Sequence, residues 1–146
     1  MTPRSFGLAV ALLGVLVGTL PFVRWYRADL PARDVVRSGI DVSGELWSLP
    51  ILACVIVAIG VAVAAGLPDP MTVTARWLGG ICAIAGALCM AWALLSAFRI
   101  TSIAVPVGVA DGPPAPLRVQ PAAFIAAAAG AAVAAVSLLW VRTGSD

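Results

Sequence analysis

Four long apolar stretches, at about residues 6–23, 46–67, 77–98 and 122–141, constrain the fold of this chain more than any other feature. None of them contains Asp, Glu, Lys or Arg, and each is 18 to 22 residues long. An α-helix needs about 20 apolar residues to cross the hydrocarbon core of a bilayer. We therefore predict an all-α membrane protein, a single domain over residues 1–146 built as a four-helix transmembrane bundle.

The composition requires the same class. Apolar residues make up 62% of the chain, charged residues 11%, and the mean hydropathy is +1.05. Soluble domains are about 45–50% apolar and about 25% charged. A water-soluble fold of 146 residues could not bury so much apolar surface, so lipid must cover it, and we expect a multi-pass protein of the cell (inner) membrane.

The first apolar stretch has a second interpretation as a signal peptide, because Arg4 precedes its apolar core. The stretch is long for such a core, and residues 20–23 (Leu-Pro-Phe-Val) make a poor cleavage site. We therefore expect an uncleaved helix and keep the signal peptide as the alternative.

Small residues recur at helical spacing in the first and third stretches. Gly14 and Gly18 have the spacing that lets two helix backbones approach closely. We expect packing within the bundle, with a homo-oligomer through these two glycines as the alternative. A second stripe, Cys82, Gly86 and Met90, runs beside the first one in the third stretch. The candidate packing residues are Gly7, Ala11, Gly14 and Gly18 in the first helix, and Gly79, Ala83 and Ala87 in the third.

The loop at residues 24–45 holds half of the formal charge of the chain, as four arginines and four acids. Its aromatic residues suit the membrane–water interface, and its arginines can bind lipid phosphates or a partner protein. Within it, Pro31 to Gly39 suggests a short helix, and Ile40 to Val42 a short strand. The candidate partner or lipid-headgroup contacts are Arg24, Trp25, Tyr26, Arg27, Arg33, Arg37 and Trp47, together with Arg99 of the second long loop.

That second loop, residues 99–121, alternates large apolar and small residues from Ile103 to Val109, which is the period of a strand. Asp111 to Pro114 is a turn signal, and Leu117 to Val119 allows a returning strand. We predict a small β-hairpin cap whose partner is the Ile40–Val42 strand. The alternative is an irregular proline-rich crossover.

The residue inventory limits the chemistry. The chain has no histidine, which removes the commonest general base and metal ligand. Its three cysteines, at 54, 82 and 89, all lie in apolar stretches, and the glycines form no phosphate-binding motif. A net charge of +2 does not indicate nucleic acid binding. We therefore expect no catalytic residue, no metal and no cofactor.

The loop acids leave one catalytic alternative open. Asp29 and Asp34, or Asp41 and Glu45, are near enough in sequence for acid–base work. Pairing with the neighbouring arginines and hydration account for these carboxylates better, so an enzyme is the lesser hypothesis.

Four spans place both termini on one side of the membrane and both long loops on the other. Six arginines lie on the loop side and three on the terminal side. The positive-inside rule alone does not decide the orientation, because the loops are longer and the free amino terminus adds a charge to its own side.

Two patches carry a resemblance: residues 20–26 (LPFVRWY) and residues 43–50 (SGELWSLP). With the four-span layout, they resemble the small membrane proteins of actinobacteria, mycobacteria especially, and the tryptophan-associated transmembrane family. The resemblance implies that the termini lie inside and the long loops outside. It transfers no functional residues.

We expect a non-enzymatic adaptor or accessory subunit whose outer loops dock an exported cell-envelope protein or a larger membrane complex. A subunit of a lipid or small-molecule transport assembly is the alternative. The expected partners are membrane lipids and another membrane or envelope protein.

Overall fold

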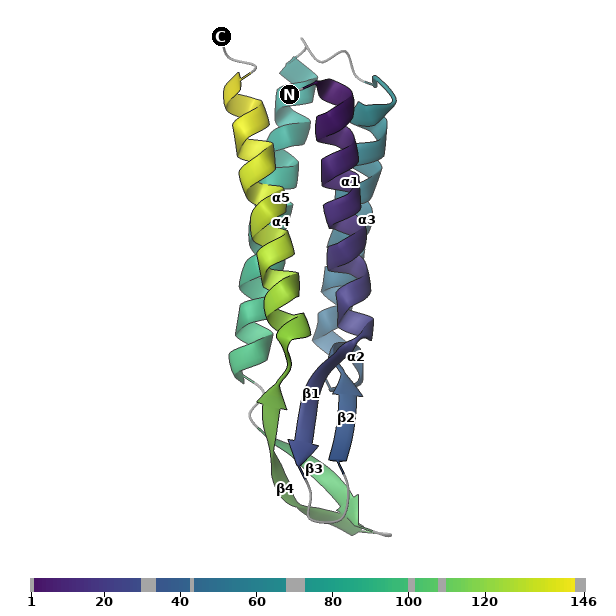
Figure 1. Cartoon of the computed structure of the whole chain (residues 1–146), viewed down its shortest axis with the longest axis vertical. Coiled ribbons are helices and arrows are strands. Elements are labelled where there is room, and N and C mark those ends of the chain that lie inside the picture. The colour runs from purple at the N-terminus through teal and green to yellow at the C-terminus, as the bar shows by residue number, and fades with distance from the viewer. Residues whose placement is uncertain are drawn as a thin grey trace.

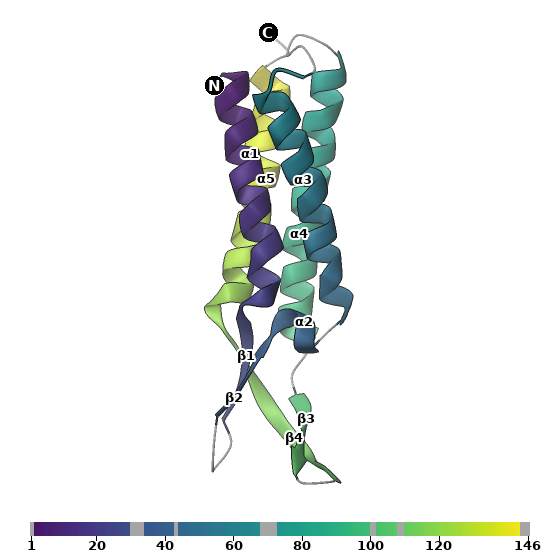
Figure 2. The same cartoon turned by 90° about the vertical axis from the view of Figure 1, so that its right-hand side faces the viewer.

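The computed structural model describes residues 2–29, 34–42, 44–67, 73–99, 102–107 and 110–143. Four long helices form an antiparallel bundle, and a β-sheet extends from one end of it, opposite the two chain termini (Figures 1 and 2). The elements in chain order are α1 (Pro3–Thr19), η1 (Leu20–Phe22), β1 (Arg24–Asp29), β2 (Asp34–Ser38), α2 (Gly39–Val42), η2 (Gly44–Trp47), α3 (Ser48–Ala64), α4 (Val73–Arg99), β3 (Ser102–Val107), β4 (Ala110–Val119) and α5 (Pro121–Thr143).

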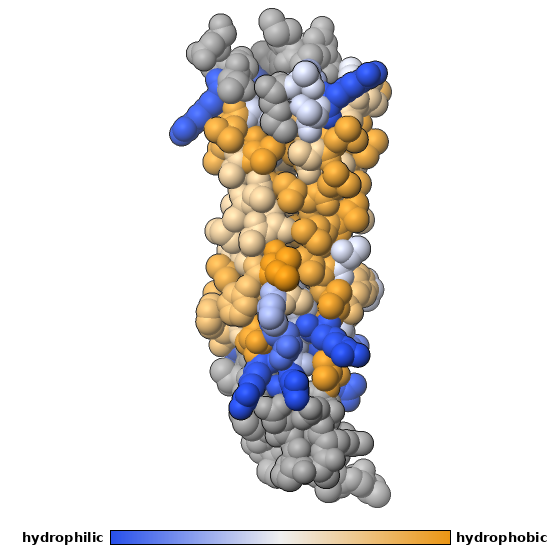
Figure 3. Space-filling view, viewed as in Figure 1, coloured by the Kyte–Doolittle hydropathy of each residue, from blue (hydrophilic) through white to orange (hydrophobic). Residues whose placement is uncertain are grey.

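Four helical segments are long and apolar enough to cross a membrane, which confirms the predicted fold class. They are Pro3–Phe22, Glu45–Ala64, Arg76–Arg99 and Pro121–Arg142. Large apolar side chains cover the outside of the bundle along its length (Figure 3), and Leu12 of α1 is 71% exposed. A continuous apolar surface of this extent is compatible with a multi-pass membrane protein.

The second span ends at Ala64, three residues before its predicted end at Leu67. Gly66 adopts a positive φ of 82°. The amide of Leu67 donates to the carbonyl of Ala62, and that of Gly66 to the carbonyl of Val63. This is a Schellman C-cap, in which a left-handed glycine ends the helix and satisfies its last carbonyls. The apolar pattern continues past Gly66, so hydropathy alone placed the boundary too late.

The bundle consists of two closely packed helix pairs, α1 with α3 and α4 with α5, and contacts of α1 with α5 and of α3 with α4 close the ring. Each pair meets at glycines. A Cβ on Gly60 would lie 2.7 Å from the amide nitrogen of Ala11. A Cβ on Gly86 would lie 2.7 Å from the carbonyl oxygen of Gly130. Backbones therefore approach too closely in both pairs for any side chain to fit between them.

The first predicted stripe lies on the α1–α3 contact. A Cβ on Gly7 would clash with the backbone of Ala64, one on Gly14 would lie 2.8 Å from Val57, and one on Gly18 would lie 2.9 Å from Ala53. This face of α1 is thus occupied within the chain. A homo-oligomer through Gly14 and Gly18 stays a prediction, and it would require α1 to separate from α3.

The predicted stripe of α4 needs a correction. Gly79 packs against Trp140 and Val141, and Ala83 is buried, but Ala87 is exposed. Because four residues overshoot one helical turn of 3.6, a strict four-residue repeat drifts around the helix and away from its neighbour. The second predicted stripe also lies at α5: a Cβ on Gly86 would lie 2.7 Å from the carbonyl oxygen of Gly130, one on Gly130 would lie 2.7 Å from the amide nitrogen of Met90, and Cys82 is buried.

The sheet combines both long loops in the strand order β2-β1-β4-β3, with every pair antiparallel. The predicted hairpin is confirmed as β3 and β4. Its partner was predicted wrongly: β4 pairs with β1, through Tyr26 opposite Val119, and Gly39–Val42 forms the short helix α2. The short helix predicted from Pro31 to Gly39 is also wrong, because Asp34–Ser38 is strand β2; Pro31 itself lies outside the described residues.

Asp111 to Pro114, predicted to be a turn, lies inside β4. This proline-rich half of β4 pairs with β3, while only Leu117 to Val119 pair with β1. A strand with one partner tolerates proline, because the missing N–H can face the open side.

Candidate functional site

The junction between the bundle and the sheet gathers most of the predicted site residues. Trp25 and Tyr26 are both 0% exposed, although neighbouring residues of a strand normally point to opposite faces. The pairing of β1 with β2 shifts between Arg24 and Tyr26, so Trp25 is the extra residue of a β-bulge. A bulge redirects a side chain, which lets both rings enter the core. Both rings were predicted to contact a partner protein or lipid headgroups, and that prediction is wrong because both are buried.

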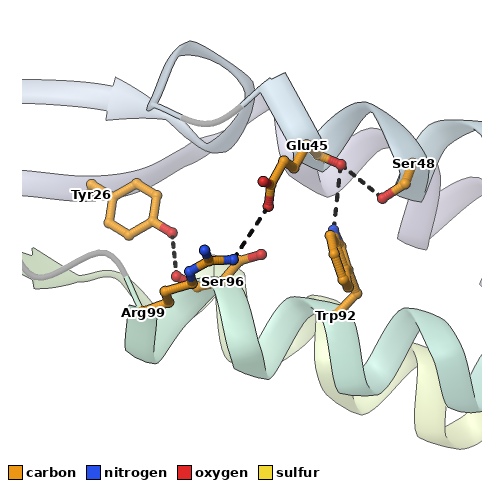
Figure 4. Close-up of polar contacts among 6 residues, drawn as sticks. All are labelled: Tyr26, Glu45, Ser48, Trp92, Ser96 and Arg99. Atoms are coloured by element: carbon orange, nitrogen blue, oxygen red, sulfur yellow. Dashed lines mark hydrogen bonds and ion pairs between the residues drawn. The ribbon is translucent and has the colours of Figure 1, made fainter.

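Both buried rings donate a hydrogen bond to a carbonyl at the end of a helical segment. The Tyr26 hydroxyl donates to the carbonyl oxygen of Ser96 at 3.0 Å (Figure 4). Trp25 Nε1 donates to the carbonyl oxygen of Leu20 at 2.7 Å. Ser96 is among the last four residues of α4, whose carbonyls have no partner within the helix. Strand β1 thereby caps α4 and is fixed to the bundle at two points.

A second set of contacts ties α4 to the start of α3 (Figure 4). The carbonyl oxygen of Glu45 accepts hydrogen bonds from Ser48 Oγ at 2.8 Å and from Trp92 Nε1 at 3.3 Å. The Glu45 carboxylate lies 3.8 Å from Arg99, and both of these side chains are exposed. An exposed ion pair adds little stability, so the hydrogen bonds to the backbone provide most of this connection.

Burial raises the pKa of Tyr26 above its usual value of 10.0. The neutral phenol is therefore the form that the folded protein favours. The stability that Tyr26 contributes is complete below pH 10.0 and is lost as the pH rises through the raised pKa of the folded state. Tyr26 is the chain's one tyrosine, so ultraviolet titration of its phenolate should give a midpoint above 10.0 in the folded protein. An ordinary midpoint would show that the ring is solvated.

Exposed arginines surround this junction, where Figure 3 shows a band of hydrophilic surface below the apolar bundle. Of the arginines predicted to contact a partner or lipid headgroups, Arg24, Arg27, Arg37 and Arg99 are exposed, and Arg33 lies outside the described residues. Arg27 stands directly opposite Arg118 on β4. Among the residues that the structure describes, Arg24 and Arg37 have no carboxylate within ion-pair distance.

Trp47 is an exposed aromatic ring at the start of the second span, at 52% exposure. Its ring meets Phe22 edge-on, with ring centroids 5.6 Å apart. At the other end of the bundle Trp77 is 70% exposed. Aromatic rings at both ends of an apolar surface are typical of the two membrane–water interfaces.

The described loop acids have structural roles. Asp41 Oδ2 accepts a hydrogen bond from the Ser38 amide, and the Ser38 hydroxyl accepts one from the Asp41 amide, which together cap α2. Glu45 faces Arg99. Asp29 stands opposite Asp34 in the sheet, but their side chains are outside the described set. Within the described ranges, no group of three or more His, Cys, Asp or Glu side chains is placed to hold a metal ion.

The sequence analysis did not identify the residues that contact the predicted packing and site residues. The helix contacts of Gly60 and Gly130 could have been found, because a lone glycine in an apolar helix signals close packing. Trp92 offered a weaker signal, since a buried indole N–H needs an acceptor. Ser96 acts through its carbonyl oxygen, and no sequence pattern identifies that atom.

No family model, no curated protein and no solved structure matches this chain.

Proposed function

We propose that this protein is a non-enzymatic membrane adaptor or accessory subunit, and that its extramembrane sheet docks another protein. The observation that carries the proposal is the joint sheet, in which residues 24–38 and 102–119, far apart in sequence, pair as four strands in the order β2-β1-β4-β3. A bundle needs no such structure, because a few residues suffice to connect antiparallel helices.

Buried side chains and hydrogen bonds attach the sheet to the bundle. Trp25 and Tyr26 are buried and bonded to the ends of helical segments, and the Gln120 amide donates to the Trp25 carbonyl at 2.7 Å as β4 leads into α5. Binding to an ordered surface avoids the entropic cost of ordering a loop. Arg24 and Arg37, which have no carboxylate partner among the described residues, add charge that a partner protein can neutralise.

We place the sheet outside the cytoplasm, at the cell (inner) membrane, with both termini inside. The resemblance of residues 20–26 and 43–50 to the tryptophan-associated transmembrane proteins of actinobacteria supports this orientation. An exported cell-envelope protein, or the outer part of a larger membrane complex, is then the partner that the sheet can reach.

Photo-cross-linking in living cells tests the docking. A photoreactive amino acid at Arg24 or Val36 in the sheet is expected to give discrete adducts with another protein. The same amino acid at Leu12 or Ile84, which are 71% and 64% exposed on the apolar bundle, serves as the matched control. Adducts no stronger from the sheet than from the bundle would sink the adaptor proposal.

Cysteine labelling tests the orientation. In a background with Cys54, Cys82 and Cys89 replaced by alanine, Ser38→Cys is expected to react with a membrane-impermeant maleimide in intact cells. Arg4→Cys is expected to react only after the membrane is permeabilised. The reverse pattern would place the sheet in the cytoplasm, and the partner would then be cytoplasmic.

A further inference from the structure

The two edges of the extramembrane sheet differ. The strand order leaves β2 and β3 as the edge strands, and Figure 1 shows β2 on the side of β1 away from β4. Strand β3 contains Pro106, at an irregularity in its pairing with β4. Proline removes a backbone donor and blunts an edge. Strand β2, with the sequence DVVRS, has no proline, so it is the edge able to accept another strand.

The register shows which backbone groups of β2 face outward. The Gln120 amide donates to the Trp25 carbonyl, so at Trp25 strand β1 bonds toward β4. Backbone groups alternate in direction along a strand, so Arg27 also bonds toward β4, while Tyr26 and Ala28 bond toward β2. Their partners on β2 are Arg37 and Val35. The residue between these two, Val36, therefore points its N–H and C=O away from β1, toward the open edge.

The side chains along β2 are suited to a strand of defined chemistry. Val36 lies opposite Arg27 on one face of the sheet and is 38% exposed. Arg37 lies on the other face, opposite Tyr26, and has no carboxylate partner among the described residues. In a sheet, directly opposed apolar or β-branched residues stabilise pairing, and so do opposed charges of opposite sign.

We propose that β2 accepts an extended segment of the partner protein as a fifth strand of the sheet. The segment places an apolar, β-branched residue beside Val36 and an acidic residue beside Arg37, so that it alternates between valine-like and glutamate-like residues. This inference rests on the proposed docking function and names the chemistry of the docked segment. Backbone hydrogen bonds supply affinity, and the alternating side chains supply selectivity, as in other cases of strand addition.

The test uses the full chain in phosphatidylcholine nanodiscs and a fluorescein-labelled peptide of eight residues that alternates valine and glutamate. Fluorescence anisotropy should show saturable binding. The same peptide with alternate backbone amides methylated should bind with an affinity at least about tenfold lower. Two lost backbone hydrogen bonds amount to roughly a tenfold change in affinity. A valine–lysine peptide should also bind about tenfold more weakly.

Three variants locate the site. Val36→Pro removes the outward N–H, which does not take part in the pairing of β2 with β1, and should weaken binding about threefold or more, while the thermal unfolding temperature stays close to that of the parent. Val36→Thr keeps the N–H and should bind within about twofold. Arg37→Glu should reverse the preference from the glutamate peptide to the lysine peptide.

Several results would overturn the inference: no saturable binding, binding insensitive to amide methylation, or binding that survives Val36→Pro. A dimer in nanodiscs that Val36→Pro dissociates would assign the edge to a second copy of this chain instead. Cross-linking from Arg24 separates this failure from failure of the proposed function. Partner adducts that persist in the Val36→Pro chain leave docking intact and remove only the β2 edge, whereas their absence in the parent chain removes docking itself.

Discussion

Replacing Tyr26 by alanine is expected to lower the free energy of unfolding by about 3–5 kcal/mol, the range for removing a large buried aromatic ring. Tyr26 is completely buried between the sheet and the bundle, and its hydroxyl is bonded to the Ser96 carbonyl at 3.0 Å. The substitution leaves both a cavity and an unsatisfied carbonyl at the end of α4. Denaturant titration in detergent micelles measures the loss, and hydrogen exchange of the β1 amides should show that the sheet detaches first.

Two further substitutions separate the contributions at this position. Tyr26→Phe keeps the ring and removes the hydroxyl, so it should cost about 1–3 kcal/mol, the penalty for an unmade buried hydrogen bond. Trp77→Ala removes a larger ring that is 70% exposed, and it should change stability by less than about 0.5 kcal/mol. Equal effects of Tyr26→Ala and Trp77→Ala would show that the sheet is not anchored through Tyr26.

Alanine at Gly86 or Gly130 is expected to destabilise the α4–α5 pair by about 1–3 kcal/mol, the usual cost of overpacking. The added methyl group at Gly86 would lie 2.7 Å from the Gly130 oxygen and the Ala134 nitrogen, and that at Gly130 would lie 2.7 Å from the Met90 nitrogen. These neighbours are backbone atoms, which cannot move aside by changing rotamer. The two helices must therefore separate, and thermal unfolding in detergent should show the loss.

Gly80 provides the matched control, because it lies on the same helix and a Cβ there would meet nothing within 4 Å. Gly80→Ala should leave stability unchanged or raise it by up to about 1 kcal/mol, since alanine is the better helix former. If Gly80→Ala and Gly86→Ala were equally destabilising, the loss would come from helix conformation and not from the helix contact.

The α1–α3 pair shows which part of a glycine contact can be predicted from sequence. Gly7 and Gly60 bring α1 and α3 together, and a Cβ on Gly60 would lie 2.7 Å from the Ala11 nitrogen. The glycine spacing of α1 was visible in the sequence, and the facing glycine of α3 followed no repeat. Which glycine meets which depends on how the helices are arranged around the ring, and one sequence does not contain that information.

The sequence by itself determined the transmembrane architecture. Transfer of apolar side chains from water to lipid depends on composition and length over about 20 residues, and the four uncharged stretches satisfy both conditions. The β3–β4 hairpin was predictable for a similar reason, since alternation from Ile103 onward is a local property. Alternation was misleading at Gly39–Val42, which forms a helix capped by hydrogen bonds between Ser38 and Asp41 and not a strand.

Only the tertiary structure decided what the charged loop after α1 becomes. Trp and Tyr are residue types typical of the membrane–water interface. A bulge opposite Arg37 and Ser38 nevertheless directs the rings of Trp25 and Tyr26 into the core. Their acceptors, the carbonyls of Leu20 and Ser96, are backbone atoms whose positions depend on where helical segments end in space. The joint sheet forms because β1 pairs with β4, about 90 residues later in the chain, and β2 is left as an edge strand. No local sequence pattern predicts this long-range pairing.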